Sequence, residues 1–314
     1  MAASTSFINS EIAELAATRN CRRGRESIAI QVAGQVFGLF AESTVGLALG
    51  KELAAFAVDA DSCDVRMTVN WTREMNLPRR RPLFESGGLW SVYQENGGYR
   101  FFFSTSALGD TPYKSAWFDE GFAGGCVQLF QPYFDASRAI YPLEYPLDEL
   151  VMIHRLARGE GVEIHGLGVV DDAGRGHLFI GHSGAGKSTL ARLWQQESRA
   201  LILSDDRIIL RERDGRIWMH GTPWHGDAGI ASPQAAPLHR AYLIEHGGRT
   251  EFIDVTKGRA AAELLARCFV PHYSADAMDF TLGFLARVAQ ETPCRVFRFL
   301  PDKSAVEAIG RASD

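Results

Sequence analysis

The pattern of hydrophobic and polar residues divides the chain into two parts of different character. Up to about residue 140, the apolar runs are short, rich in aromatic residues and separated by glycine. They are SIAIQVAGQVFGLF (27–40), GGYRFFFSTS (97–106) and GGCVQLFQPYF (124–134). Such runs predict strands, the first of which is interrupted at Gly34. Residues 1–140 are therefore expected to form a β-rich, mostly antiparallel domain, preceded by a short helix over Ser10–Thr18.

From about residue 141 onward, helical and strand patterns alternate. LDELVMIHRLARGEG predicts a helix that ends near Gly159 or Gly161. VEIHGLGVVDDAGRGHLFI then predicts two strands joined by a tight turn at Asp172–Gly176. Because that turn is too short to contain a crossover helix, the two strands should form an antiparallel hairpin.

The remaining pattern completes a domain of mixed type over residues 141–314. The predicted elements are a helix from Lys187, a short apolar strand 200–206 that ends in two aspartates, a hairpin turning at Asp214–Gly215, a strand 239–247, helices 257–269 and 275–291, a strand 296–300 and a final helix from Lys303. This order predicts an α/β (α+β) fold with a mixed, partly antiparallel sheet.

Composition narrows the function classes. The chain has 314 residues, of which 46% are hydrophobic and 23% charged, as in an ordinary globular protein with one or two sizeable cores. A formal net charge of -5 argues against nucleic acid as a partner. No uncharged apolar stretch is long enough to span a membrane. Five cysteines without a C-x-x-C pair, and an N-terminus without a signal-peptide pattern, favour a cytoplasmic protein.

Residues 181–189, GHSGAGKST, match the beginning of two different kinds of active site. GHSGA is close to the G-x-S-x-G turn that presents a nucleophilic serine in hydrolases. GHSGAGKS fits G-x-x-x-x-G-K-S, the loop that surrounds nucleotide phosphates. The hydrolase interpretation is disfavoured, because Ala185 replaces its second glycine and Lys187 and Ser188 would have no role.

The phosphate-loop hypothesis gives every part of this segment a task. Glycines let the backbone turn so that N–H groups point at a phosphate, and the positive end of the following helix adds to that field. Lys187 supplies a cation for the phosphates, and the hydroxyl of Ser188 is suited to Mg²⁺. The predicted nucleotide-binding residues are Gly181, His182, Ser183, Gly184, Ala185, Gly186, Lys187, Ser188 and Thr189.

Phosphoryl transfer also requires a further metal contact and a proton acceptor, and two aspartates are candidates. Asp205 and Asp206 follow the apolar strand LILS, so both could reach the phosphates if the strand ends there. A solvated turn is the simpler alternative. Glu245, after the strand AYLI, is a competing acid and ranks below the pair, because the pair is accompanied by His165 on the strand before the loop. A histidine there could stabilise transferred charge or relay a proton.

EIHG, a short hairpin, GHSGAGKST and LILSDDRI together resemble the HPr kinase/phosphorylase family and, more distantly, phosphoenolpyruvate carboxykinase. The resemblance covers residues 150–245 well, whereas residues 1–140 do not resemble that family's usual N-terminal domain. It implies an ATP- and Mg²⁺-dependent kinase that acts on a serine hydroxyl. By that match, His165 and Lys187 lie at the phosphates, Ser188 and Asp205 hold the metal, and Asp206 is the base.

The acceptor is left open. The segment GTPWHGDAGIAS (221–232) departs from the family's later glycine-rich motif, and Asp227 is its candidate acid. The chain looks closer to divergent relatives that act on other serines, including those of precursor peptides, with residues 1–140 in substrate or partner recognition. A nucleotide-regulated binding module and a small-molecule kinase are the alternatives. The resemblance also suggests a homo-oligomer. A supporting basic residue is expected among Arg207, Arg240, Arg249, Lys257 and Arg259.

Overall fold

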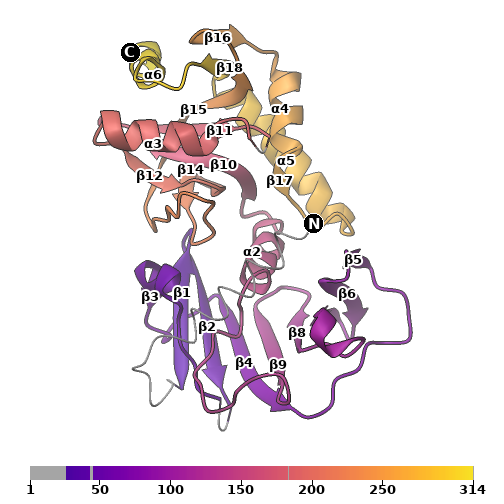
Figure 1. Ribbon diagram of the computed structural model, residues 1–314. Helices are drawn as coiled ribbons and strands as arrows, with labels where there is room; N and C mark the ends of the chain where they lie inside the picture. The colour runs from indigo at the N-terminus through magenta and orange to yellow at the C-terminus, as the bar shows by residue number, and fades with distance from the viewer. Residues whose placement is uncertain (1–25, 43–44, 183, 314) are drawn as a thin grey trace. The chain divides into compact units, whose positions relative to one another are not determined.

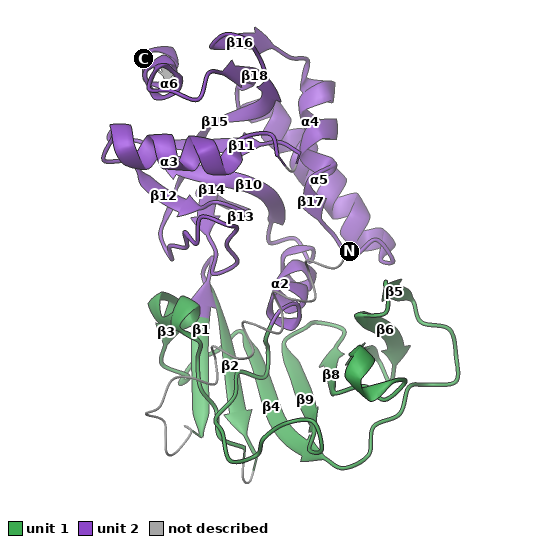
Figure 2. Ribbon diagram, viewed as in Figure 1, with its two compact units in different colours: residues 1–30, 35–144 green, residues 31–34, 145–314 purple. Residues whose placement is uncertain are grey.

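The computed structural model describes residues 26–42, 45–182 and 184–313, which form two compact units (Figures 1 and 2). The first unit comprises residues up to 30 and 35–144, and the second comprises residues 31–34 and 145–314. The helix expected at Ser10–Thr18 and the loop residue Ser183 lie outside the described residues.

The first unit is built on a nine-stranded sheet with the order β3-β1-β2-β4-β9-β8-β7-β6-β5. Its strands are β1 (Ser27–Val32), β2 (Gln35–Ala41), β3 (Ala57–Val58), β4 (Val65–Thr72), β5 (Phe84–Ser86), β6 (Trp90–Glu95), β7 (Gly98–Phe103), β8 (Lys114–Asp119) and β9 (Gly124–Phe130), with short 3-10 helices at Lys51–Phe56 and Ser106–Leu108. Ala33 and Gly34 have φ of 49° and 80°, the left-handed pair that a two-residue hairpin turn requires. The predicted interruption at Gly34 is therefore the turn between β1 and β2.

The expectation of mostly antiparallel pairing omitted two parallel ladders at the centre of this sheet. β4 runs parallel to both β2 and β9, while β5 to β9 form an antiparallel series. The core is aromatic: Phe101, Phe118 and Phe122 are fully buried, and the last two rings stack at 5.2 Å. Parallel pairing joins segments far apart in the sequence, which local patterns do not encode.

The second unit also contains a nine-stranded sheet, and it confirms the predicted mixed type. The order β11-β10-β13-β14-β15-β18-β16 is extended by β12 and β17, which pair with β10. The elements are α2 (Leu147–Leu156), β10 (Val162–Val170), β11 (Gly176–Ile180), α3 (Lys187–Glu197), β12 (Leu201–Ser204), β13 (Arg207–Arg213), β14 (Arg216–Gly221), β15 (Ala235–His246), β16 (Glu251–Asp254), α4 (Lys257–Leu265), β17 (Cys268–Phe269), α5 (Ala275–Glu291), β18 (Cys294–Phe299) and α6 (Ser304–Ser313).

Both predicted hairpins are confirmed. β10 and β11 pair antiparallel from Gly166↔Ile180 to Val170↔Gly176, and Asp214 and Gly215 turn β13 into β14 with φ of 53° and 71°. On its other side β11 runs parallel to β15, which runs parallel to β18. The predicted helix 257–269 is wrong at its end. It stops at Leu265, because the following residues pair with β10 as β17.

Helices cover both faces of this sheet (Figure 1). Apolar residues of α3 and α6 pack with Phe179, Tyr242 and Phe297 on one face, and those of α4 and α5 pack with Leu178 and Leu243 and their neighbours on the other. Alternate residues along a strand thus pack into the two cores on opposite faces of the sheet, as the two-residue period of a strand requires. The cysteines that the structure describes, Cys63, Cys126, Cys268 and Cys294, are free. Among the described helices, none is long and apolar enough to cross a membrane.

Candidate phosphate-binding site

The loop after β11 has a backbone shaped by its glycines. Gly184 and Gly186 have φ of 80° and 105°, a region that side-chain-bearing residues rarely adopt. A Cβ on Gly181 would lie 2.9 Å from the Cβ of Ala185, and one on Gly186 would lie 3.0 Å from the ring of Phe299. The tight path of the loop therefore depends on glycine at these positions.

The N-terminus of α3 is arranged as an anion site would be. No side chain caps it at Gly186, and no acidic residue lies in its first turn. Free N–H groups at a helix start, together with the helix dipole, favour a negatively charged ligand. Ser188 and Thr189, the predicted metal and phosphate contacts, are half-buried in this first turn. The chemistry of the loop fits a phosphate group.

Lys187 is the buried cation of the loop. Its side chain is only 7% exposed, and its Nζ donates to the carbonyl oxygens of Gly181 at 3.0 Å and His182 at 3.3 Å. Burial lowers the pKa of Lys187, and the charges of Arg267 and Arg207 act in the same direction, against the opposing effect of Asp206. The ammonium group of Lys187 therefore interacts electrostatically with Asp206, Arg207 and Arg267.

His165 and Asp206, which were both expected near the phosphates, lie in contact. Nδ1 of His165 is 3.0 Å from Oδ1 of Asp206, because His165 of β10 stands opposite Arg207 of β13 in the ladder. Nη1 of Arg207 donates to the other oxygen of Asp206 and lies 3.1 Å from Nδ1 of His165. Burial opposes ionisation of Asp206, but the hydrogen bond with His165 and the charges of Arg207 and Lys187 outweigh it and lower its pKa. The ionised form of Asp206 is thus stabilised by its neighbours.

Asp205 has a different environment from its neighbour. Its side chain is buried, and it accepts hydrogen bonds from the backbone N–H groups of Gly226 at 3.0 Å, Ala228 at 2.9 Å and Ile230 at 3.4 Å. The carboxylate therefore organises the loop after β14. This placement differs from the one expected for a metal ligand, since both oxygens already accept hydrogen bonds. Its metal role stays a prediction.

Two further acids approach Arg207 from its buried side. Oε1 of Glu149, on α2, lies 2.6 Å from Nε of Arg207, and Oε1 of Glu163, on β10, lies 3.6 Å from it. Burial and then the charge of Glu149 raise the pKa of Glu163 well above its usual range. The ring of Phe269, on β17, stacks beneath the guanidinium at 4.3 Å. The contacts of Arg207 thus come from four separate segments.

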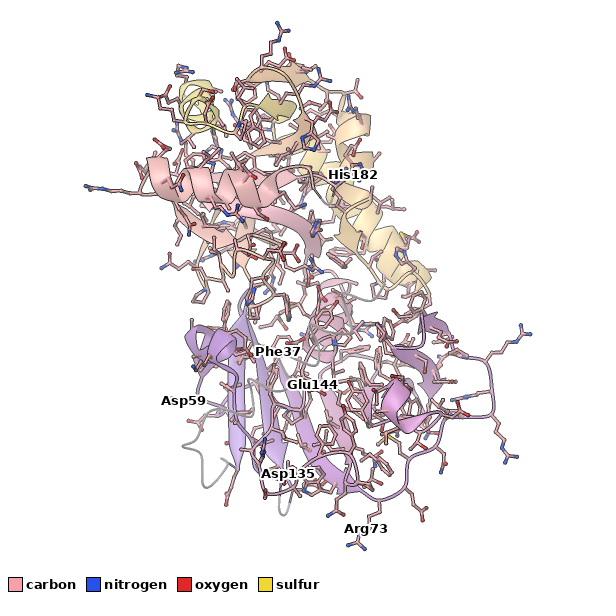
Figure 3. All side chains as sticks on the ribbon, viewed as in Figure 1. Phe37, Asp59, Arg73, Asp135, Glu144 and His182 are labelled. Atoms are coloured by element: carbon pink, nitrogen blue, oxygen red, sulfur yellow. The ribbon has the colours of Figure 1, made fainter. Side chains whose placement is uncertain are left out.

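A second arginine lies at the phosphate loop. Arg267 precedes β17, and its Nη2 is 3.0 Å from Nε2 of His182, the loop residue labelled in Figure 3. Nη1 of Arg267 pairs with Glu263 at 2.6 Å, and the carbonyl oxygen of Arg267 accepts from the N–H of His165. A cation in this position could neutralise a bound phosphate.

The other candidate acids are paired elsewhere or exposed to solvent. Glu245 is paired with Arg259 and Arg298, each at 2.9 Å, so the alternative acid is already neutralised. Asp227 is exposed in the loop that Asp205 organises. Within the described residues, no group of three or more histidine, cysteine or acidic side chains has the arrangement of a metal site.

The structure therefore brings His165, Asp206 and Arg207 into contact beside Lys187, whereas Asp205 binds the loop after β14 and Glu245 is paired with two arginines. Two residues of this site were not found from the sequence: Glu149 and Arg267. Glu149 is one of two acids in the first turn of a helix, which is ordinary helix chemistry. Arg267 follows a helix and belongs to no motif, so neither carried a usable signal.

No known protein-family profile matches the chain, and no curated protein is similar to it. One solved structure that it resembles is the Hpr(Ser) kinase/phosphatase from Coxiella burnetii. The two share 13% identity over 48% of this chain and 94% of that one, with a TM-score of 0.27. This likeness is distant, and the residue roles below rest on the geometry of this chain.

Proposed function

We propose that the second unit is an ATP- and Mg²⁺-dependent phosphotransferase that moves the γ-phosphoryl group to a hydroxyl. Serine of a protein or precursor peptide is the proposed acceptor. The observation that carries the proposal is the electrostatic coupling of Lys187, in the loop, to Asp206, which is held by His165 and Arg207 on the adjacent strands. Phosphoryl transfer needs a group that can accept the hydroxyl proton, and this carboxylate lies beside the lysine of the loop.

In this proposal the chain binds ATP with the N–H groups of the loop and of the first turn of α3. Lys187 neutralises charge on the β- and γ-phosphates, and Arg267 is placed to add to it. The hydroxyl of Ser188 would hold Mg²⁺, which neutralises phosphate oxygens when it is bound. Most of the rate enhancement would come from positioning and fixed charge.

The proton of the acceptor is assigned to Asp206. The hydroxyl oxygen forms a bond to the γ-phosphorus, while the bond from that phosphorus to the bridging oxygen breaks and ADP leaves with the electron pair. The hydroxyl proton passes to a carboxylate oxygen of Asp206. Because the transition state of this reaction is loose, a weakly basic carboxylate can accept that proton late in the step.

The test is incubation of the protein with γ-labelled ATP and Mg²⁺ in a lysate of the source cells. Lys187→Ala should abolish labelling, whereas Lys303→Ala, which removes an exposed lysine just before α6, should not. A labelled protein or peptide band that vanishes only with the first variant supports the kinase and yields its acceptor. Label found only in free phosphate would favour a nucleotide-regulated binding module, and label in a small metabolite would favour a small-molecule kinase.

A further inference from the structure

Arg207 joins the proposed catalytic carboxylate to a helix that takes no part in the phosphate loop. Nε of Arg207 donates to Glu149 of α2 at 2.6 Å, and Nη1 contacts Asp206 and His165. The ring of Phe269 covers one flat face of the guanidinium. Because guanidinium is planar and rigid, fixing one edge of Arg207 also fixes the direction of the edge that meets Asp206.

The two acids behind Arg207 cannot touch a substrate. Glu149 is 6% exposed and Glu163 is 0% exposed. They also differ in their contact with Arg207. Oε1 of Glu149 lies 2.6 Å from Nε and Oε1 of Glu163 lies 3.6 Å from it, and burial together with the charge of Glu149 raises the pKa of Glu163 well above its usual range. Glu149 is therefore the acid that is hydrogen-bonded to the guanidinium.

A buried ion pair is a poor source of stability, because taking both charges out of water opposes most of their attraction. Its physical consequence is orientation: with Glu149 in place, Arg207 has one favourable direction. Without that acid, the guanidinium could swing toward solvent and leave Asp206 free to rotate. A misplacement of about 1 Å in a reacting group can reduce turnover on the order of 100-fold.

We propose that Glu149 is a positioning residue for the phosphoryl transfer: it holds Arg207 in the orientation in which the guanidinium fixes Asp206 beside His165. The inference rests on the proposed function and extends it to a residue of α2 that neither the phosphate loop nor the aspartate pair includes. It also distinguishes the two buried glutamates near Arg207, because Glu163 is assigned no positioning role.

Glu149→Gln and Glu163→Gln form a matched pair, because each replaces a buried acid by its isosteric amide. Glu149→Gln is expected to lower kcat about 10- to 100-fold while KM for ATP changes less than about twofold, since the phosphate loop is untouched. Glu163→Gln resembles the protonated acid and should change kcat less than about threefold. Thermal unfolding of both variants checks that the differences do not arise from loss of folded protein.

Arg207→Lys extends the pair into a double-mutant cycle. The lysine keeps the charge but cannot bridge Glu149 and Asp206, so Glu149→Gln should lower kcat little further in this background. Independent, multiplicative losses would contradict the inference. Equal losses from Glu149→Gln and Glu163→Gln, or wild-type kcat in folded Glu149→Gln, would also overturn it.

A spectroscopic readout separates this inference from the function on which it rests. In ¹⁵N-labelled protein, the ring signals of His165 report its contact with Asp206 and Arg207. Glu149→Gln should shift them, and Glu163→Gln should leave them in place. If the wild-type protein transfers phosphate to no acceptor, the proposed function fails, and these signals alone decide the positioning. Unshifted His165 signals in Glu149→Gln would refute it.

Discussion

The two units have sheets of equal strand number, but they bury different chemistry. Among the described residues of the first unit, Lys114 is the one charged side chain that is buried. In the second unit the buried acidic, basic and histidine residues among those described are Asp148, Glu149, His154, Glu163, His177, Lys187 and Asp205. All nine histidines of the chain also follow residue 150. The first unit thus has an almost wholly apolar and aromatic core, and the second accepts the desolvation of many charges.

The difference indicates where chemistry is concentrated. Burying a charge opposes folding unless a partner compensates it, and groups with shifted pKa values gather at functional sites more often than elsewhere. In the second unit, one such group surrounds Lys187, Asp206 and Arg207 at the phosphate loop. The shifts in the first unit are of another kind: burial and then the charge of Glu144 raise the pKa values of Tyr113 and Tyr133. Substrate or partner recognition by this unit stays a prediction.

The largest expected effect comes from Asp206→Asn. The amide cannot accept the hydroxyl proton and loses the charge that Arg207 and His165 hold, so transfer should fall about 10²–10⁴-fold. The rate of labelled acceptor formation at saturating ATP measures it. Lys114→Met in the first unit, made in parallel, should retain the wild-type rate. Wild-type turnover by Asp206→Asn would remove the proposed base.

Acid should weaken the second unit first. Burial lowers the pKa of His154 and of His220 to about 4, below the ordinary value near 6.5. The folded state keeps both rings neutral, so the unfolded chain binds more protons in this window. The contribution of these two histidines to stability therefore falls as pH drops from about 6.5 toward 4, by about 2 kcal/mol per histidine at pH 5. Hydrogen-exchange mass spectrometry at pH 7 and pH 5, corrected for intrinsic rates, should show the loss in peptides from 145–313. An equal loss in peptides from 45–140 would contradict this comparison.

A smaller effect is expected from Asp205→Asn. Its carboxylate accepts three backbone hydrogen bonds from the loop after β14, and the amide would turn a donor toward N–H groups. The free energy of unfolding should fall by about 1–3 kcal/mol, as measured by urea denaturation. Transfer per folded molecule should fall much less than with Asp206→Asn. A loss of transfer equal to that of Asp206→Asn, with unchanged stability, would instead support the metal role.

The smallest effect is expected in the first unit. Nζ of Lys114 lies 3.3 Å from Oε1 of Glu144 and 4.7 Å from the ring of Phe103. The side chain of Glu144 is 38% exposed, so water can hydrate it when the lysine is removed. Lys114→Met should therefore change the free energy of unfolding by less than about 1 kcal/mol. A loss above about 3 kcal/mol would mean that this unit also depends on a buried charge.

Local patterns were sufficient for the elements that short-range chemistry determines. The turns at Gly34 and at Asp214–Gly215 have the left-handed backbone that their residues favour, and the helix after Lys187 follows from its apolar spacing. That His165 and the aspartate pair would lie near the same phosphates was also expected, from the resemblance of EIHG and LILSDDRI to the HPr kinase family. The parallel ladders of β4 and the end of α4 were not, since they depend on distant segments.

The aspartate pair shows where sequence reasoning stops. Two adjacent acids after a strand must diverge, but the sequence does not say which one meets His165 and which one turns into the loop. That choice depends on the N–H groups of residues 226–230 and on the guanidinium of Arg207. Likewise, nothing in the sequence distinguishes the environment of Glu149 from that of Asp148, since both are acids in the first turn of α2.

The pairing of β10 has a consequence for the order in which the chain acquires its parts during synthesis. This strand pairs with β11, β12 and β13, and also with β17, about a hundred residues later. The N–H of His165 donates to Arg267, so that the surroundings of this histidine are incomplete until the segment before α5 has left the ribosome. Closing so long a loop is slow relative to hairpin formation. The nascent protein should therefore have its phosphate loop well before it has the finished centre, and a ribosome-bound chain stopped near residue 260 should be catalytically silent.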